Sequence, residues 1–152
     1  MDIKAEQVQK LREKTGLGMM DVRNALVQAE GNEEEAIKIL EEKAGAKLEK
    51  RADRATSQGR VGVYSHMNNK LGVMIELQCE TDFVADSEDF VAAVKDMCLH
   101  AAFTKPASVE ELLEQDFVKD SSKKIADIVR DLSAKTGENV RLAKVAVFEL
   151  GS

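Results

Sequence analysis

Residues 61–79, VGVYSHMNNKLGVMIELQC, decide the fold of the larger part of this chain. Apolar side chains recur at alternate positions on both sides of two asparagines, at Val61, Val63, Leu71, Val73, Ile75 and Leu77. This alternation is typical of strands with one buried face. Asn68 and Asn69 favour a tight turn, because asparagine tolerates a positive φ angle. Residues 60–79 are therefore predicted to form an antiparallel hairpin.

A third strand is predicted near the end of the sequence, with apolar residues at Val140, Leu142, Val145 and Val147. The helical patterns between the hairpin and this strand have serine N-cap candidates at Ser87, Ser108, and Ser121 or Ser122. Serine is a favoured N-cap residue, and Gly137 is placed to stop the last of these helices. Helices grouped against a small antiparallel sheet predict an α+β core over residues 60–152.

The first third of the chain carries helical patterns over residues 4–14, over residues 19–29 and from Asn32 onwards. Glu35 follows Asn32 at a capping-box spacing. Because helices this short bury little singly, a three-helix bundle is predicted over residues 1–45. Residues 46–59 are rich in basic and poor in large apolar side chains, which favours a solvated helical linker over a binding patch.

Composition limits the classes of function. Lys and Arg total 22 against 28 Asp and Glu, so the net charge of −6 argues against general nucleic-acid binding. No apolar run reaches the length of a membrane span, and the first ten residues have no signal-peptide core. Two cysteines make no disulfide framework, so a cytoplasmic protein is expected.

No GxSxG hydrolase motif, P-loop, HExxH metalloprotease motif or CxxC motif is present in the sequence. Cys79, Cys98 and His100 match the spacing of no common zinc module, so no metal site is expected and buried cysteines are the favoured interpretation. A helper enzyme built on His66, His100 and Cys79 is a remote alternative. We expect no cofactor and no active site.

Residues 79–86, CETDFVAD, form an unusual segment where a strand ends and a helix follows. Thr81 is placed to cap a first helical turn, and Asp82 is favourable at its positive end. Phe83 and Val84 are adjacent, and both cannot easily point into one core. Phe83 therefore either seals the edge of the core, which residue chemistry alone favours, or is an apolar anchor for a partner.

A second candidate segment is Gly18-Met19-Met20-Asp21, at the start of the second helical pattern. Gly18 is the expected cap. Methionine suits adaptable binding surfaces and also fills irregular gaps in a core. The spacing predicts that one of Met19 and Met20 points inward and the other outward.

The sequence resembles the bacterial elongation factor Ts family. The resemblance is carried in order by KLREKTGLGMMDVRNAL at 10–26, AEGNEEEAIKIL at 29–40, LGVMIELQCETDFVA at 71–85, DFVKD at 116–120 and TGENVRLAKVAVFELG at 136–151. It implies an N-terminal domain similar to ubiquitin-associated domains and a core with an antiparallel sheet. It also implies a guanine-nucleotide exchange factor that binds elongation factor Tu and promotes GDP release.

The resemblance also assigns candidate site residues. The family motif that enters the GTPase near its magnesium ion maps onto Thr81, Asp82, Phe83 and Val84. The part that docks on the GTPase domain maps onto the start of the second helix, and the candidates are Gly18, Met19, Met20 and Asp21. The chain is similar to short, single-core members, which implies a homodimer. The alternative function is a non-catalytic adaptor that binds another protein through residues 1–45.

Overall fold

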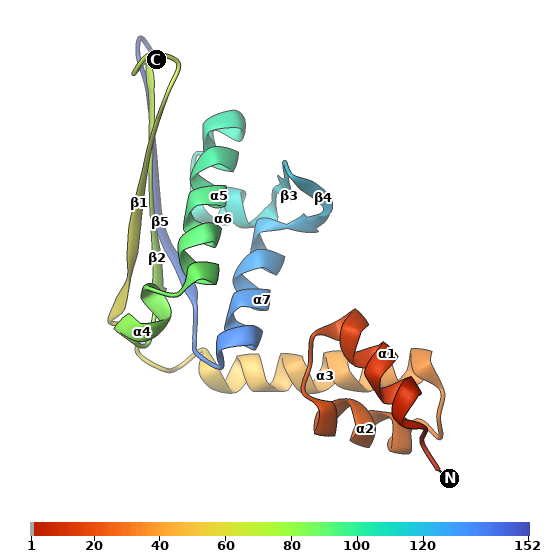
Figure 1. The fold of residues 1–152 in the computed structure, drawn as a ribbon. Helices are drawn as coiled ribbons and strands as arrows, with labels where there is room; N and C mark the ends of the chain where they lie inside the picture. Colours follow the sequence, from red (N-terminus) through yellow and green to blue (C-terminus); the bar gives the residue numbers. More distant parts are fainter. Residues whose placement is uncertain (1) are drawn as a thin grey trace. The chain divides into compact units, whose positions relative to one another are not determined.

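The structure is a computed structural model that describes residues 2–152 (Figure 1). Its elements are, in chain order, α1 (Ala5–Thr15), α2 (Met19–Gln28), α3 (Glu33–Arg51), β1 (Gln58–His66), β2 (Leu71–Cys79), α4 (Asp82–Ala85), α5 (Glu88–Thr104), α6 (Val109–Glu114), β3 (Asp116–Phe117), β4 (Asp120–Lys124), α7 (Ile125–Thr136) and β5 (Arg141–Glu149). They divide into two compact units, one ending at Ala52 and the other spanning Asp53–Ser152.

The first unit contains the three helices that the sequence predicts at its N-terminal end. Their inner faces bury Val8, Leu11, Val22, Ala25, Leu26, Ala29, Ala36 and Leu40. Asn32 caps α3, because its Oδ1 accepts hydrogen bonds from the backbone N–H groups of Glu34 and Glu35 at 3.0 and 3.2 Å. The helix continues to Arg51, well past its last buried residue, Leu40.

The second unit is built on an antiparallel sheet of order β1-β2-β5, which confirms the predicted α+β class. Met67, Asn68 and Asn69 all have positive φ in the β1–β2 connection, as the two asparagines indicate. The strands β1 and β2 pair in register from Gln58 opposite Cys79 to His66 opposite Leu71.

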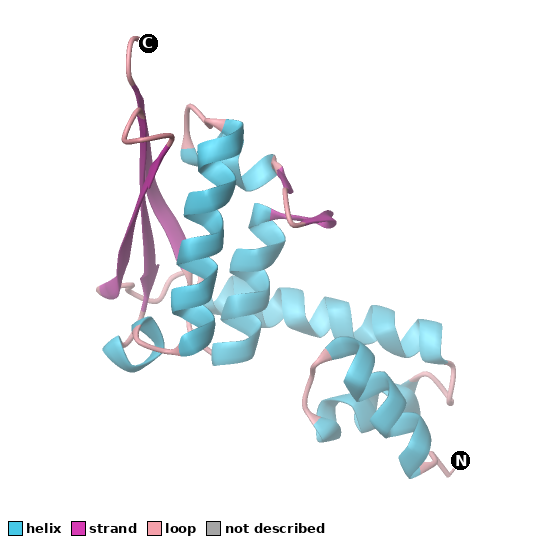
Figure 2. Cartoon of the chain, turned by 45° about the horizontal axis from the view of Figure 1, so that its top comes forward, coloured by secondary structure: helices cyan, strands magenta, loops and turns pink. Residues whose placement is uncertain are grey.

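One face of this sheet carries the helices. Figure 2 shows α5 lying along the sheet, with α7 beside α5. The core between them contains Leu71, Val73, Ile75, Leu77, Phe90, Val94, Met97, Cys98, Leu112, Ile125, Leu132 and Leu142. Gly62 allows α5 to lie close to β1, since a Cβ atom built there would lie 2.7 Å from the Cys98 Sγ.

The opposite face of the sheet is turned away from α5 and carries apolar side chains. Val61 and Val63 from β1, Met74 from β2 and Phe148 from β5 are all exposed there, with 53, 72, 46 and 73% of their surfaces accessible. The register places Val63 opposite Met74 and Phe148 opposite Gly72, so these side chains form one continuous outer face. Isolated exposed apolar residues are common, but a contiguous set of them is typical of an interaction surface.

Two details of the second unit differ from expectation. The alternation in β5 is interrupted because the pairing with β2 shifts register between Glu76 and Leu77, and a bulge adds one residue to one strand. The expectation that Ser121 or Ser122 caps α7 is wrong. Both serines lie in β4, and the helix begins after Lys124, whose backbone N–H donates to Asp127 at 2.9 Å.

Candidate functional site

The corner, residues 81–84, lies between the end of β2 and the start of α5. Thr81 has an extended conformation and caps α4, because its Oγ1 accepts a hydrogen bond from the backbone N–H of Val84 at 3.3 Å. Asp82 occupies the first turn, where a carboxylate is stabilised by the helix dipole. The expected cap and acidic first turn are therefore both present.

The corner separates its two neighbouring apolar side chains. Val84 is buried with 7% of its surface accessible, whereas Phe83 is 83% accessible. The interpretation of Phe83 as a plug that seals the core is therefore wrong. The single turn of α4 is the physical cause, because its inward side is already filled by Val84 and Ala85. Phe83 is held outward on a short, well-anchored turn.

Two polar side chains from other elements hold the corner, and the sequence analysis missed both. Glu138 accepts hydrogen bonds through Oε1 from the backbone N–H groups of Glu80 and Thr81, at 3.1 and 3.0 Å. Its Oε2 accepts from the Thr81 hydroxyl at 2.6 Å. At the other end, Arg60 donates to the Ala85 carbonyl at 3.2 Å. No local sequence signal links these residues to the corner, because the contacts cross more than twenty positions.

Cys79, at the end of β2, and Cys98, in α5, are both buried and are structural residues. The Cys79 thiol donates to the Thr81 carbonyl at 3.1 Å. Burial, and then the negative charge of Glu138, raises the pKa of the Cys79 thiol above its ordinary value. Burial raises the pKa of Cys98 to about 11, so both side chains are neutral thiols at neutral pH.

The second candidate segment begins α2 in the first unit. Gly18 is the N-cap, as expected, and Asp21 lies in the first turn with its carboxylate 3.7 Å from the Lys47 ammonium. Met19 and Met20 are 57 and 61% accessible. The prediction that one of them points inward is wrong, because the helix begins at Met19 and its buried stripe starts only at Val22.

The histidine and cysteine side chains considered for zinc binding or for catalysis make separate contacts in the structure. His66 and Cys79 lie at opposite ends of the β1–β2 ladder, and the His66 Nδ1 is 2.8 Å from the Tyr64 hydroxyl. His100 is buried, with Nε2 2.9 Å from the Gln115 Oε1 and Nδ1 accepting from the Val118 N–H. Over residues 2–152, no group of three or more metal-ligating side chains is close enough to hold an ion.

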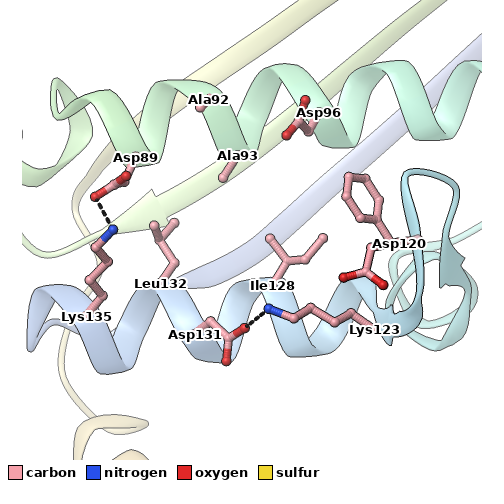
Figure 3. A pocket seen from close by; sticks show the side chains of 11 residues that line it. Asp89, Ala92, Ala93, Asp96, Asp120, Lys123, Ile128, Asp131, Leu132 and Lys135 are labelled. Carbon is pink, nitrogen blue, oxygen red and sulfur yellow. Dashed lines mark hydrogen bonds and ion pairs between the residues drawn. The ribbon is translucent and has the colours of Figure 1, made fainter. Parts of the chain in front are cut away.

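A groove of about 320 Å³ lies between α5 and α7 (Figure 3). Its floor is apolar, with Ala93, Ile128 and Leu132 pointing into it. Four of the six charged side chains on its rim pair with one another, Lys135 with Asp89 at 2.9 Å and Lys123 with Asp131 at 3.1 Å. The other two have partners outside the lining, because Asp96 pairs with Lys119 at 2.7 Å and Asp120 accepts from the Ser122 backbone N–H at 3.1 Å. These pairs are solvent-exposed, so the groove offers no set of convergent free polar groups of the kind that orients a small substrate.

The molecule is thus a two-unit protein, α-helical and then α+β, in which each unit presents exposed apolar side chains at the start of a helix. This arrangement is typical of a factor that acts by binding another protein. No helix among residues 2–152 is both long and apolar enough to span a membrane.

Comparison with known proteins agrees with this class. The family model for elongation factor Ts matches residues 80–152, which include the corner and Glu138. The chain is 40% identical to elongation factor Ts of Maridesulfovibrio salexigens over 195 residues, covering 99% of this chain and 95% of that protein. It is 37% identical to that of Herpetosiphon aurantiacus over 197 residues, with complete coverage of both chains.

The chain belongs to the elongation factor Ts family. It is a translation elongation factor that acts as a nucleotide exchange factor for elongation factor Tu. Both alignments extend over more positions than the 152 residues of this chain, so those two relatives carry segments that it lacks. A relative from Clostridium botulinum, 42% identical over 144 residues, is about twice as long, with 47% of its length covered.

Proposed function

We propose that the corner, residues 81–84, is the part of this factor that enters the GTPase domain of elongation factor Tu and displaces its magnesium ion. The observation that carries the proposal is the position of Phe83, which is 83% accessible on a turn whose neighbours Val84 and Ala85 are buried. An exposed aromatic ring on an anchored turn contributes to binding with little ordering cost, because the backbone is already fixed. Phe83 acts as a wedge between side chains of the GTPase, and Thr81 and Asp82 shape the turn that carries it.

The physical basis of exchange is thermodynamic linkage. A factor that binds nucleotide-free GTPase more tightly than the GDP-bound form weakens GDP binding by the same ratio. The magnesium ion is the largest local charge on the GDP phosphates, so its displacement removes much of their attraction to the protein. The factor therefore needs no acid, base or metal of its own, and it shifts populations without altering the GDP/GTP equilibrium in solution.

The start of α2 supplies a second contact, which docks on the same GTPase domain. Met19 and Met20 are exposed side by side after the Gly18 cap, and Asp21 completes the segment. Flexible thioether side chains adapt to a protein surface at low cost. We expect this contact to add affinity rather than to move the magnesium ion. As a translation factor, the protein acts in the cytoplasm.

The proposal includes a homodimer formed through the outer face of the sheet. Val61, Val63, Met74 and Phe148 form an exposed apolar face on the side away from α5. Two such faces, packed as a sandwich about a twofold axis, bury these side chains in a self-complementary interface.

The test is catalysed release of fluorescent GDP from elongation factor Tu, measured over a range of factor concentrations. Phe83→Ala is expected to slow release by about thirtyfold, because truncation of an interface anchor commonly costs over ~2 kcal/mol. Phe103→Ala is the matched control, because Phe103 is 71% accessible in the same unit but lies near the end of α5. An unchanged release rate for Phe83→Ala, with thermal unfolding like that of the natural chain, would reject the wedge.

A further inference from the structure

The loop after α7 forms a clamp on the corner, and the clamp is reciprocal. The Glu138 carboxylate accepts from two backbone N–H groups and one hydroxyl of residues 80 and 81. In return, the Glu80 Oε2 accepts from the backbone N–H of Asn139 at 2.6 Å. The Glu138 carboxylate thus accepts from the backbone at Glu80 and Thr81, and the Glu80 carboxylate accepts from the backbone at Asn139, next to Glu138. Hydrogen bonds to an ionised carboxylate are about twice as strong as neutral ones.

Contacts with the end of α7 hold Glu138 in place. Gly137 closes α7 with a φ of 75°, which glycine adopts without strain, and turns the chain back towards the sheet. The Ser133 hydroxyl, from the last turns of α7, donates to the Glu138 carbonyl at 2.6 Å. The Glu138 N–H donates to the Thr136 Oγ1 at 3.3 Å. The carboxylate is thus presented by a rigid helix end rather than by a free loop.

The clamp acts on the residue that defines the geometry of the corner. Thr81 Oγ1 donates to Glu138 and accepts from the Val84 N–H, so one hydroxyl joins the clamp to the cap of α4. The Thr81 carbonyl accepts from the Ala85 N–H at 3.2 Å, which closes the turn that carries Phe83. Loss of the carboxylate leaves the Glu80 and Thr81 N–H groups and the Thr81 hydroxyl without this partner.

We propose that Glu138 is a positioning residue that holds the corner in the conformation that presents Phe83 to the GTPase. The inference rests on the function proposed above, and it adds a residue from a distant part of the chain to that function. In this role Glu138 acts through Thr81 and the corner rather than by contact with the nucleotide or the magnesium ion. It acts by raising the fraction of molecules whose corner is already in the binding conformation, and apparent affinity is proportional to that fraction.

The experiment uses the full chain, elongation factor Tu and fluorescent GDP. Glu138→Ala is expected to lower the rate of release at limiting factor by about tenfold, because the corner loses three charge-assisted hydrogen bonds. Glu138→Gln keeps an oxygen for the two N–H groups and is expected to recover most of the rate. Glu111→Ala is the control, since the Glu111 carboxylate also accepts from a loop N–H, that of Ala107 four residues earlier, at 3.0 Å, and belongs to α6 rather than to the corner.

A double-mutant cycle separates positioning from general stability. If Glu138 acts through Phe83, then Glu138→Ala has little further effect in the Phe83→Ala chain. Amide hydrogen exchange provides the second readout: the Glu80 and Thr81 amides are expected to exchange faster in Glu138→Ala, while the β1–β2 ladder stays protected.

The outcomes distinguish the two proposals. If Phe83→Ala releases GDP at the rate of the natural chain, the proposal that Phe83 is a wedge is overturned. A slow Phe83→Ala with a natural rate for Glu138→Ala overturns the clamp alone. The clamp is also overturned if Glu138→Ala slows release by the same factor with and without Phe83, or if its corner amides exchange no faster than those of the natural chain.

Discussion

Substitution of Gly62 by alanine tests the close packing of α5 against β1. The new Cβ would lie 2.7 Å from the Cys98 Sγ, and the Val94 side chain also stands in its way. Ordinary contacts between such atoms are about 3.5–4.0 Å, so α5 must move away from β1 by roughly 1 Å. Overpacking of this kind costs about 1–3 kcal/mol, which lowers the unfolding temperature of a unit this size by at least ~4 °C.

The assay is thermal and urea unfolding followed by tyrosine fluorescence. Tyr64 is the single tyrosine, the chain has no tryptophan, and Tyr64 lies two residues from Gly62 on β1, so the signal reports the second unit alone. Gly72→Ala is the matched control, because a Cβ at Gly72, in the neighbouring strand, meets nothing within 4 Å. Val94→Ala should partly restore the Gly62→Ala chain by making room. Equal unfolding temperatures for Gly62→Ala and Gly72→Ala would refute the reasoning.

Three further predictions concern other parts of the molecule. The double substitution Met19→Ser and Met20→Ser should raise the factor concentration needed for half-maximal GDP release several-fold and leave the maximal rate unchanged. The control Val27→Ser, at a residue similarly exposed on α2, should change neither quantity. A lowered maximal rate for the double substitution would contradict a docking role. Val63→Asp should convert the proposed dimer to monomer at micromolar concentration in sedimentation, since it buries a charge in the shared face; a natural chain that already sediments as a monomer would exclude the dimer. Burial raises the pKa of the Cys98 thiol from 9.0 to about 11, so the unfolded chain loses this proton at lower pH than the folded chain. The contribution of the thiol to the free energy of unfolding is therefore complete below pH 9. It falls by up to ~1.4 kcal/mol per pH unit between pH 9 and 11. Unfolding free energies of the natural and Cys98→Ala chains should converge over this range, and a constant difference would contradict the burial.

Local chemistry explains why parts of the site were predictable from sequence. The threonine cap, the acidic first turn and the glycine before Met19 all act within four residues, and each is present in the structure. The serine cap of α7 was mispredicted because a contact between two strands, rather than local chemistry, decides where this helix begins. The residues before Ile125 pair as strand β4 with β3, and this pairing competes with the local helix start.

The exposure of Phe83 could not be decided from sequence, because it depends on which neighbouring side chain occupies the space beneath the turn. Burial of Val84 and Ala85 by residues of the sheet and of α5 leaves no place for the ring. The exposure of Met20 likewise depends on tertiary packing, because the buried stripe of α2 begins only at Val22.

The sequence by itself determined the helices, the hairpin, their α+β grouping and the family, because period, caps and turn residues are local and because the family motifs lie in order along the chain. Only the tertiary structure decided that Glu138 and Arg60 hold the corner, since these contacts join positions 57 and 25 residues apart. A hydrogen bond between distant residues leaves no periodic signal in one sequence, whereas the register of the sheet and the end of α7 bring its donors and acceptor together in space.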